Sequence, residues 1–259
     1  MNGTAKDTFF LFGDSITQRG YDQDLGFGWV AALSNAYQRK LNVINAGLSG
    51  YNTRMGLRVL PRILPKPEQT KIRFLTIFFG ANDARLPNTP QTEQHVPIEQ
   101  YRDNLKKMIQ HPLVQAHSPR VILITPPPLD ETLCAKLELE VWGIDVVRRT
   151  AEVTSQYAQV VRDVGKEMNI AVLDVWSAFM HKVGWEAGQP LIGAKGVPQK
   201  KGLELSTLLV DGLHLTGEGN KIVYQELMKL IAERWPEHRP EALAFDLPYW
   251  GDEAAWKDF

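Results

Sequence analysis

Short apolar runs that alternate with longer stretches of helical periodicity constrain the fold of this 259-residue chain most strongly. The runs are rich in branched and aromatic residues, which is typical of strands buried on both faces of a sheet. We expect strands at Thr8–Phe12, Asn42–Asn45, Arg73–Phe79, Arg120–Thr125 and Ile170–Asp174. Strands alternating with helices favour right-handed crossovers and a parallel sheet. The pattern therefore predicts an α/β protein with a three-layer α/β/α, flavodoxin-like domain and a five-stranded parallel sheet.

The segments between these runs carry apolar residues at helical spacing. In residues 98–109, for example, Tyr101, Leu105 and Met108 fall on one helical face. We expect helices at Trp29–Lys40, Arg54–Leu64, Ile98–Ile109, Val141–Met168 and Glu218–Trp235. Pro61 disturbs the end of the second helix, and Gly143 gives the fourth helix a soft start.

One domain is expected over residues 1–235, with two segments outside the alternating pattern. Residues 181–209 are rich in Gly, Lys and Pro and are long for a connection, which suggests a mobile or functional loop. Residues 236–259 form a tail with the large apolar residues Leu247, Tyr249, Trp250, Trp256 and Phe259. Because such groups are unfavourable in water, we expect the tail to pack on the domain or on a partner in a homodimer.

Charge and composition narrow the classes of partner. The formal net charge of −1 gives no global field that favours nucleic acid or an anionic membrane. Cys134 is the one cysteine, so no intrachain disulfide forms.

Residues 1–8 lack the apolar core of a signal peptide, and no apolar run reaches the ~20 residues that cross a bilayer. We expect a cytoplasmic protein without nucleic-acid or membrane partners. No His/Cys cluster has metal-ligand spacing, and we expect neither a metal nor an organic cofactor.

Four short polar motifs have an order and spacing that suit one catalytic site. They are Gly13–Thr17, Ser49–Thr53, Gly80–Asp83 and Asp211–His214. The first and third follow apolar runs directly, and ligands bind at such strand ends in open α/β sheets. The motifs supply a serine, an Asp–His pair and two oxyanion donors, which are the groups that acyl transfer needs.

Ser15, His214 and Asp211 are the candidate catalytic residues. A serine hydroxyl is a poor nucleophile until a neighbour accepts its proton, and imidazole does this near neutral pH. Asp211 lies three residues before His214, where its carboxylate can hold the imidazole in the correct tautomer. Gly-Asp-Ser is also ordinary turn and cap chemistry, and Asp211 and His214 could simply cap the next helix. Thr216 and Glu218 suit that capping role equally well, so it does not require His214.

Gly50 and Asn82 are the candidate oxyanion donors, together with the backbone N–H of Ser15. Glycine allows a ligand to approach the backbone N–H closely, and asparagine supplies a neutral amide donor. Asp14 and Asp83 sit beside these positions, and we expect them to support the site by ordering its loops through hydrogen bonds to backbone N–H groups. Taken singly, each motif residue is more simply explained as a turn or cap residue, but the four motifs together favour a site.

In this combination the sequence resembles the SGNH hydrolases, or GDSL-type esterases and lipases. Further similarity to the isoamyl acetate-hydrolysing esterases lies in segments Leu11–Thr17, Gly50–Arg54, Ile77–Asp83, Val121–Pro126, Asp211–Leu215 and Leu247–Trp250. The resemblance implies Ser15 as nucleophile, His214 as base, Asp211 as third triad member, and Gly50 and Asn82 in the oxyanion hole. The sequence has Ile16 where the GDSL motif has leucine. The long stretch of residues 181–209 leaves the size of the pocket undetermined by the resemblance.

The resemblance implies a serine esterase that hydrolyses small carboxylic esters, such as acetates, through an acyl-serine. A thioesterase or a carbohydrate deacetylase is the alternative within the same family. A non-catalytic flavodoxin-like binding module is the alternative from another class. The chain lacks both a phosphate loop and a strand-then-G-x-G-x-x-G fingerprint, which disfavours a nucleotide-binding module.

Overall fold

The computed structural model describes residues 6–90 and 92–258, and its centre is a five-stranded sheet in the order β2-β1-β3-β4-β5. The strands are β1 (Thr8–Gly13), β2 (Asn42–Gly47), β3 (Ile72–Phe78), β4 (Arg120–Ile124) and β5 (Ala171–Leu173). Each neighbouring pair runs parallel. This order has the switch point of flavodoxin-like folds at β1 and β3, and the predicted fold class is confirmed.

Alternating side chains of β1 explain why the sheet is covered on both faces. Phe9 and Leu11 pack into one apolar cluster with Trp29 and Phe179. Phe10 and Phe12 point the other way, into a second cluster. A strand with apolar residues on both sides is stable only between two layers of helices, which is the arrangement that forms here.

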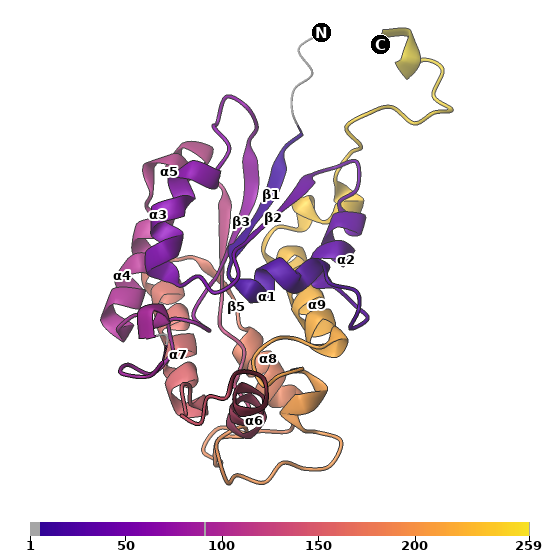
Figure 1. Cartoon of the computed structure of the whole chain (residues 1–259). Helices are drawn as coiled ribbons and strands as arrows, with labels where there is room; N and C mark the ends of the chain where they lie inside the picture. The colour runs from indigo at the N-terminus through magenta and orange to yellow at the C-terminus, as the bar shows by residue number, and fades with distance from the viewer. Residues whose placement is uncertain (1–5, 91, 259) are drawn as a thin grey trace.

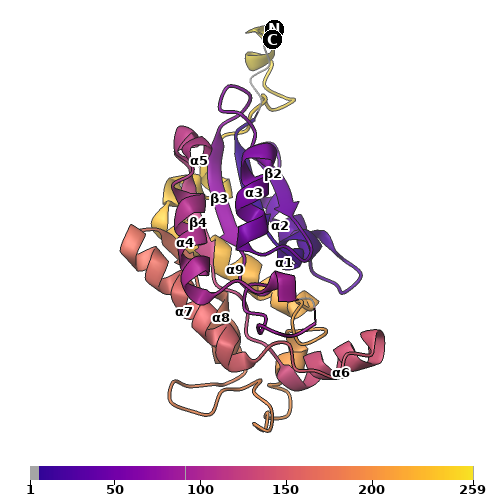
Figure 2. The same cartoon turned by 60° about the vertical axis from the view of Figure 1, so that its left-hand side comes forward.

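The helices form the two outer layers (Figure 1). The cluster on the Phe9 side receives α2 (Trp29–Ala36), α8 (Val175–Lys182) and α9 (Gly217–Arg234). The cluster on the Phe10 side receives α3 (Thr53–Ile63), α4 (Ile98–Ile109), α5 (Pro112–His117) and α7 (Ala151–Met168). Two further helices, α1 (Ser15–Gln18) and α6 (Glu131–Trp142), contribute Ile16 and Cys134 to the cluster on the Phe9 side, and α6 projects beyond the end of the sheet (Figure 2).

The expected helix over Val141–Met168 forms only over Ala151–Met168, and the expectation is wrong for residues 141–150. α6 ends at Gly143, which adopts the left-handed conformation with φ of +65°. α7 starts at a new cap, where the Thr150 hydroxyl accepts a hydrogen bond from the Val153 N–H. The intervening loop places Arg148 and Arg149 against the loop that follows β3, with bonds to Leu86 and Ala81, instead of on a helix surface. Helices α5, α6 and α8 were not predicted from the sequence.

Residues 181–209 are an irregular segment that holds the beginning of α6. Residues 181 and 182 end α8, and Leu205–Thr207 form one turn of 3₁₀ helix. The Lys195 N–H donates to the Glu131 carboxylate, and the Gln199 side-chain amide donates to Asp130, the N-cap residue of α6. The long segment therefore anchors α6 over the end of the sheet.

The C-terminal tail leaves the domain at the end of the sheet where β1 begins (Figure 1). Its first part packs on the domain, since Asp246 pairs with Lys6 and Arg39 donates to the carbonyl of Leu247. The aromatic residues beyond stand in solvent, and Trp250 is 80% exposed. The predicted contact of Phe259 falls outside the described residues. Among the helices that the structure describes, none has the length and apolar character to span a membrane.

Candidate active site

Ser15 lies where β1 turns directly into α1. Asp14 is the N-cap of that helix, and its carboxylate accepts a hydrogen bond of 2.9 Å from the Ile16 N–H. Gly13 is required at the turn, because a Cβ atom there would lie 2.6 Å from the Phe78 carbonyl oxygen. The turn thus places the Ser15 side chain at the carboxyl end of the central strand, where ligands bind in this type of sheet.

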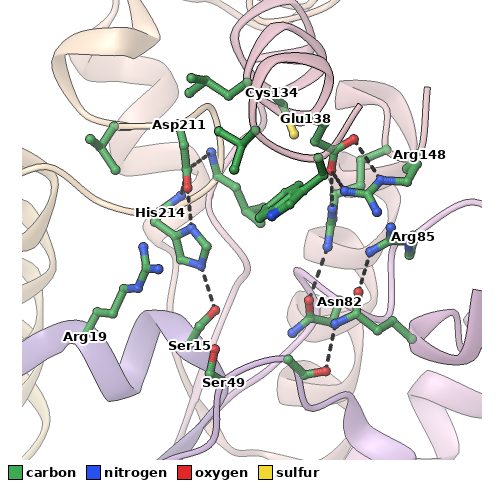
Figure 3. Close-up of a pocket in the computed structure, with 18 residues that line it drawn as sticks. Ser15, Arg19, Ser49, Asn82, Arg85, Cys134, Glu138, Arg148, Asp211 and His214 are labelled. Carbon is green, nitrogen blue, oxygen red and sulfur yellow. Dashed lines mark hydrogen bonds and ion pairs between the residues drawn. The ribbon is translucent and has the colours of Figure 1, made fainter. Parts of the chain in front are cut away.

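Ser15, His214 and Asp211 form one chain of hydrogen bonds (Figure 3). The distance from Ser15 Oγ to His214 Nε2 is 2.8 Å, and that from His214 Nδ1 to Asp211 Oδ2 is 2.6 Å. Asp211 Oδ1 also accepts the backbone N–H groups of Leu213 and His214. With Nδ1 donating to the carboxylate, Nε2 is left as the acceptor for the serine proton. This is the arrangement that nucleophilic catalysis by serine needs.

Asp211 is held as a carboxylate by its contacts. Burial by itself raises its pKa, but the hydrogen bonds and charge of His214, with the neighbouring backbone N–H groups, lower the pKa of Asp211 to about 2. A charged partner at Nδ1 stabilises the imidazolium that forms when the imidazole accepts a proton.

Gly50 and Asn82 lie beside Ser15 in the loops that follow β2 and β3. Gly50 has φ of +80°, a conformation that favours glycine. Among the described residues, the backbone N–H groups of Ser15 and Gly50 have no acceptor. One N–H of the Asn82 amide donates to the Tyr51 carbonyl over 2.9 Å, and the other remains for a ligand. Three donors are therefore available next to the serine hydroxyl.

A cavity of about 580 Å³ brings the five candidate residues together. Its walls include the nucleophile, the Asp–His pair and both oxyanion candidates, and α6 closes one side with Leu137, Val141 and Trp142. The arrangement can bind a molecule with one reactive carbonyl and an apolar group. In the described part of the chain, no group of three or more His, Cys, Asp or Glu residues could hold a metal ion.

Asp14 and Asp83 lie under the site and do not line the cavity. Asp83 accepts hydrogen bonds from both the backbone N–H and the hydroxyl of Thr53, the first residue of α3. Burial raises the pKa of each of these two carboxyls to about 7. Their observed contacts order the first turns of α1 and α3.

Sequence reasoning missed a buried charged cluster beside Asn82. Arg148 and Arg149 both bond the carboxylate of Glu138, which belongs to α6 (Figure 3). Arg149 also donates to the Asn82 side chain. One sequence signal could have indicated this cluster, namely two adjacent arginines, Arg148 and Arg149, in a stretch expected to be one helix. A helix that packs on a core buries part of its surface, and charged residues on that surface need partners.

Comparisons with known proteins agree with this geometry. The model of the GDSL-like lipase/acylhydrolase family matches residues 9–227. A GDSL esterase/lipase of Arabidopsis thaliana is 37% identical over 92% of this chain and 90% of its own length. An isoamyl acetate-hydrolyzing esterase 1 homolog of Bos taurus is 38% identical over 94% of this chain and 87% of its own length. The crystal structure of a lipase/acylhydrolase from Enterococcus faecalis is 27% identical and superposes with a TM-score of 0.60, covering 88% of this chain and 96% of that one. The chain therefore belongs to the GDSL-like lipase/acylhydrolase family and is a carboxylic ester hydrolase.

Proposed function

We propose that this enzyme hydrolyses small uncharged esters, namely acetates of short alcohols such as isoamyl acetate, with Ser15 as its nucleophile. The observation that carries the proposal is the hydrogen-bonded chain from Ser15 through His214 to Asp211 at the wall of a cavity. The substrate class is supported by the relatives named for isoamyl acetate hydrolysis.

In the first step, Ser15 Oγ attacks the ester carbonyl while His214 Nε2 accepts the hydroxyl proton. Asp211 stabilises the resulting imidazolium through Nδ1. The carbonyl oxygen becomes negative in the tetrahedral intermediate and accepts hydrogen bonds from the N–H groups of Ser15 and Gly50 and from the Asn82 amide. One such donor is typically worth about 3 kcal/mol in the transition state.

In the second half of the reaction, the imidazolium of His214 gives its proton to the alcohol oxygen as the C–O bond breaks. The alcohol leaves, and the acyl group remains on Ser15. Water then attacks the acyl carbonyl while His214 accepts one of its protons, and the same donors hold the second oxyanion. The second intermediate collapses as the bond between the acyl carbon and Ser15 Oγ breaks, and His214 returns its proton to Oγ. This step releases the carboxylic acid and regenerates the serine without a metal or an organic cofactor.

The cavity supports an apolar group on the substrate. Leu137, Val141 and Trp142 of α6 line the same cavity as the candidate triad. Each CH₂ group buried against such a surface contributes about 0.8 kcal/mol to binding. A branched alkyl group of isoamyl size suits this wall.

Steady-state kinetics on a matched series of acetate, butyrate and octanoate esters, with a thioester and an acetylated sugar measured beside them, test the proposal. We expect the highest kcat/KM for acetate, no turnover by His214→Ala, and no response to EDTA. A preference for octanoate would contradict the substrate class, and preferential turnover of thioesters or acetylated sugars would favour the alternative family activities. A wild-type protein that turns over none of these would favour a binding module.

A further inference from the structure

The side-chain amide of Asn82 needs a defined orientation to act as an oxyanion donor. Its oxygen and nitrogen have nearly the same shape, so steric packing alone does not decide which one faces a substrate. Here Nδ2 donates to the Tyr51 carbonyl at 2.9 Å, and Oδ1 accepts from Arg149 Nη2 at 3.3 Å. A rotated amide would set its oxygen against the Tyr51 carbonyl and its N–H groups against a guanidinium. Both contacts are repulsive.

Arg149 is itself fixed on three sides. Its Nε donates to the carbonyl of Ala81, the residue before Asn82, at 3.2 Å, and its Nη1 donates to Glu138 at 3.1 Å. The side chain is buried, with 7% of the residue exposed. A guanidinium is a planar fork whose donors keep a constant geometry, so one side chain can hold a carbonyl, an amide oxygen and a carboxylate together. A lysine ammonium cannot reproduce these angles.

We propose that Arg149 is a positioning residue that turns the remaining N–H of the Asn82 amide toward the oxyanion, and that Glu138 of α6 holds Arg149 in place. This inference rests on the proposed acyl-transfer function. Arg149 does not touch the reacting atoms, and it acts through the Asn82 amide. Its positive charge at Oδ1 also polarises that amide, which strengthens the N–H donors. Glu138 and Arg149 therefore connect the oxyanion hole to α6, the helix that lines the cavity where the alkyl group binds.

A double-mutant cycle between Arg149 and Asn82 tests the inference. Loss of an oxyanion donor in Asn82→Ala should lower kcat by about 10²- to 10³-fold with little change in KM. Arg149→Met should lower kcat by about 10- to 100-fold, also with little change in KM, because the amide loses its orientation only. In the Asn82→Ala background, Arg149→Met should cost less than about threefold, since no amide is left to orient.

Arg162→Met is the matched control. Arg162 lies on α7 and makes a two-bond pair with Asp174, away from the cavity. Its loss removes a partly buried arginine without touching Asn82, so kcat should stay near the wild-type value. The thermal midpoint and the far-ultraviolet circular dichroism spectrum report whether each variant is folded. If Arg149→Met does not fold, Arg149→Lys is measured in both backgrounds with the same expectation.

Two results would overturn the inference. One is an unchanged kcat in Arg149→Met, and the other is an equal loss from Arg149→Met in the wild-type and Asn82→Ala backgrounds, which would indicate a purely structural role. In both cases the wild-type enzyme remains an active esterase, so the proposed function stands. A wild-type protein inactive toward every ester would contradict both proposals.

Discussion

Individual residues of the site could be predicted from the sequence where each lies in a short motif whose chemistry indicates a role. Ser15, Asp211 and His214 each lie in a motif that states a role, and the structure brings their side chains within hydrogen-bond distance. Arg149 lies in none of the four motifs, and nothing in the sequence links it to Asn82, 67 positions away, before the fold has formed. Pairings of this kind depend on loop paths that periodicity does not reveal.

Asp83 gives a residue-scale prediction for stability against pH. Burial raises its pKa from 3.8 to about 7, although the bonds from Thr53 oppose this. The folded state therefore binds a proton that the unfolded state releases, and stability is lost as pH rises from about 4 to about 7. Asp83→Asn keeps the acceptor for Thr53 and removes the ionisation, so the thermal midpoint should fall less over this range than in the wild type.

The measurement is the thermal midpoint at pH values from 4 to 8. Asp14 keeps its own raised pKa, so part of the fall should remain in Asp83→Asn. Asp24→Asn, which changes an exposed carboxylate, serves as the control and should follow the wild-type curve. Equal slopes for wild type and Asp83→Asn would show that Asp83 does not titrate in this range.

At the scale of elements, the strands could be predicted and the helix over the site could not. Strands β1 and β3 are short, almost fully buried apolar runs, and such runs indicate central strands of a parallel sheet. Helix α6 exposes Leu139, Val141 and Trp142 to solvent, so its apolar residues do not form the single stripe of a core-facing helix. The sequence predicts a soft helix start at Gly143, but the left-handed conformation of this residue ends α6.

Trp142 tests the role of α6 in binding the alcohol group. The side chain lines the cavity while the residue is 65% exposed, so Trp142→Ala should leave the thermal midpoint almost unchanged. We expect KM for isoamyl acetate to rise by about 3- to 10-fold, with a smaller rise for ethyl acetate, because fewer CH₂ groups meet the ring. Trp250→Ala, which removes a more exposed tryptophan in the tail, should alter neither KM. Equal KM changes for both esters would contradict an alkyl-binding wall.

At the scale of the whole molecule, the two ends of the sheet have separate roles. The site occupies the carboxyl end of β1, and the tail leaves from the end where β1 begins (Figure 1). The sequence motifs predicted the first of these, since a parallel sheet fixes where its loops meet. The course of the tail depends on a few surface contacts, such as that between Arg39 and Phe245, which carry little sequence signal.

Because the aromatic residues of the tail are exposed in a single chain, a homodimer that covers them remains our prediction. Residues 249–258 include Tyr249, Trp250 and Trp256, which are 56%, 80% and 45% exposed in a single chain. Sedimentation should give the mass of a dimer for the wild type and of a monomer for a chain truncated after Pro248. The thermal midpoint at low protein concentration should be equal for both, because the removed residues bury little surface. A monomer in both samples would refute the homodimer.

The central claim is that Ser15 is activated by His214 to attack an ester. Intact-mass analysis after exposure to a fluorophosphonate tests it most directly, because the reagent captures a serine only where a base and oxyanion donors activate it. We predict one adduct on the wild-type protein, located at Ser15, and none on Ser15→Ala or His214→Ala over the same time. Labelling of Ser15→Ala at the wild-type rate would contradict the claim.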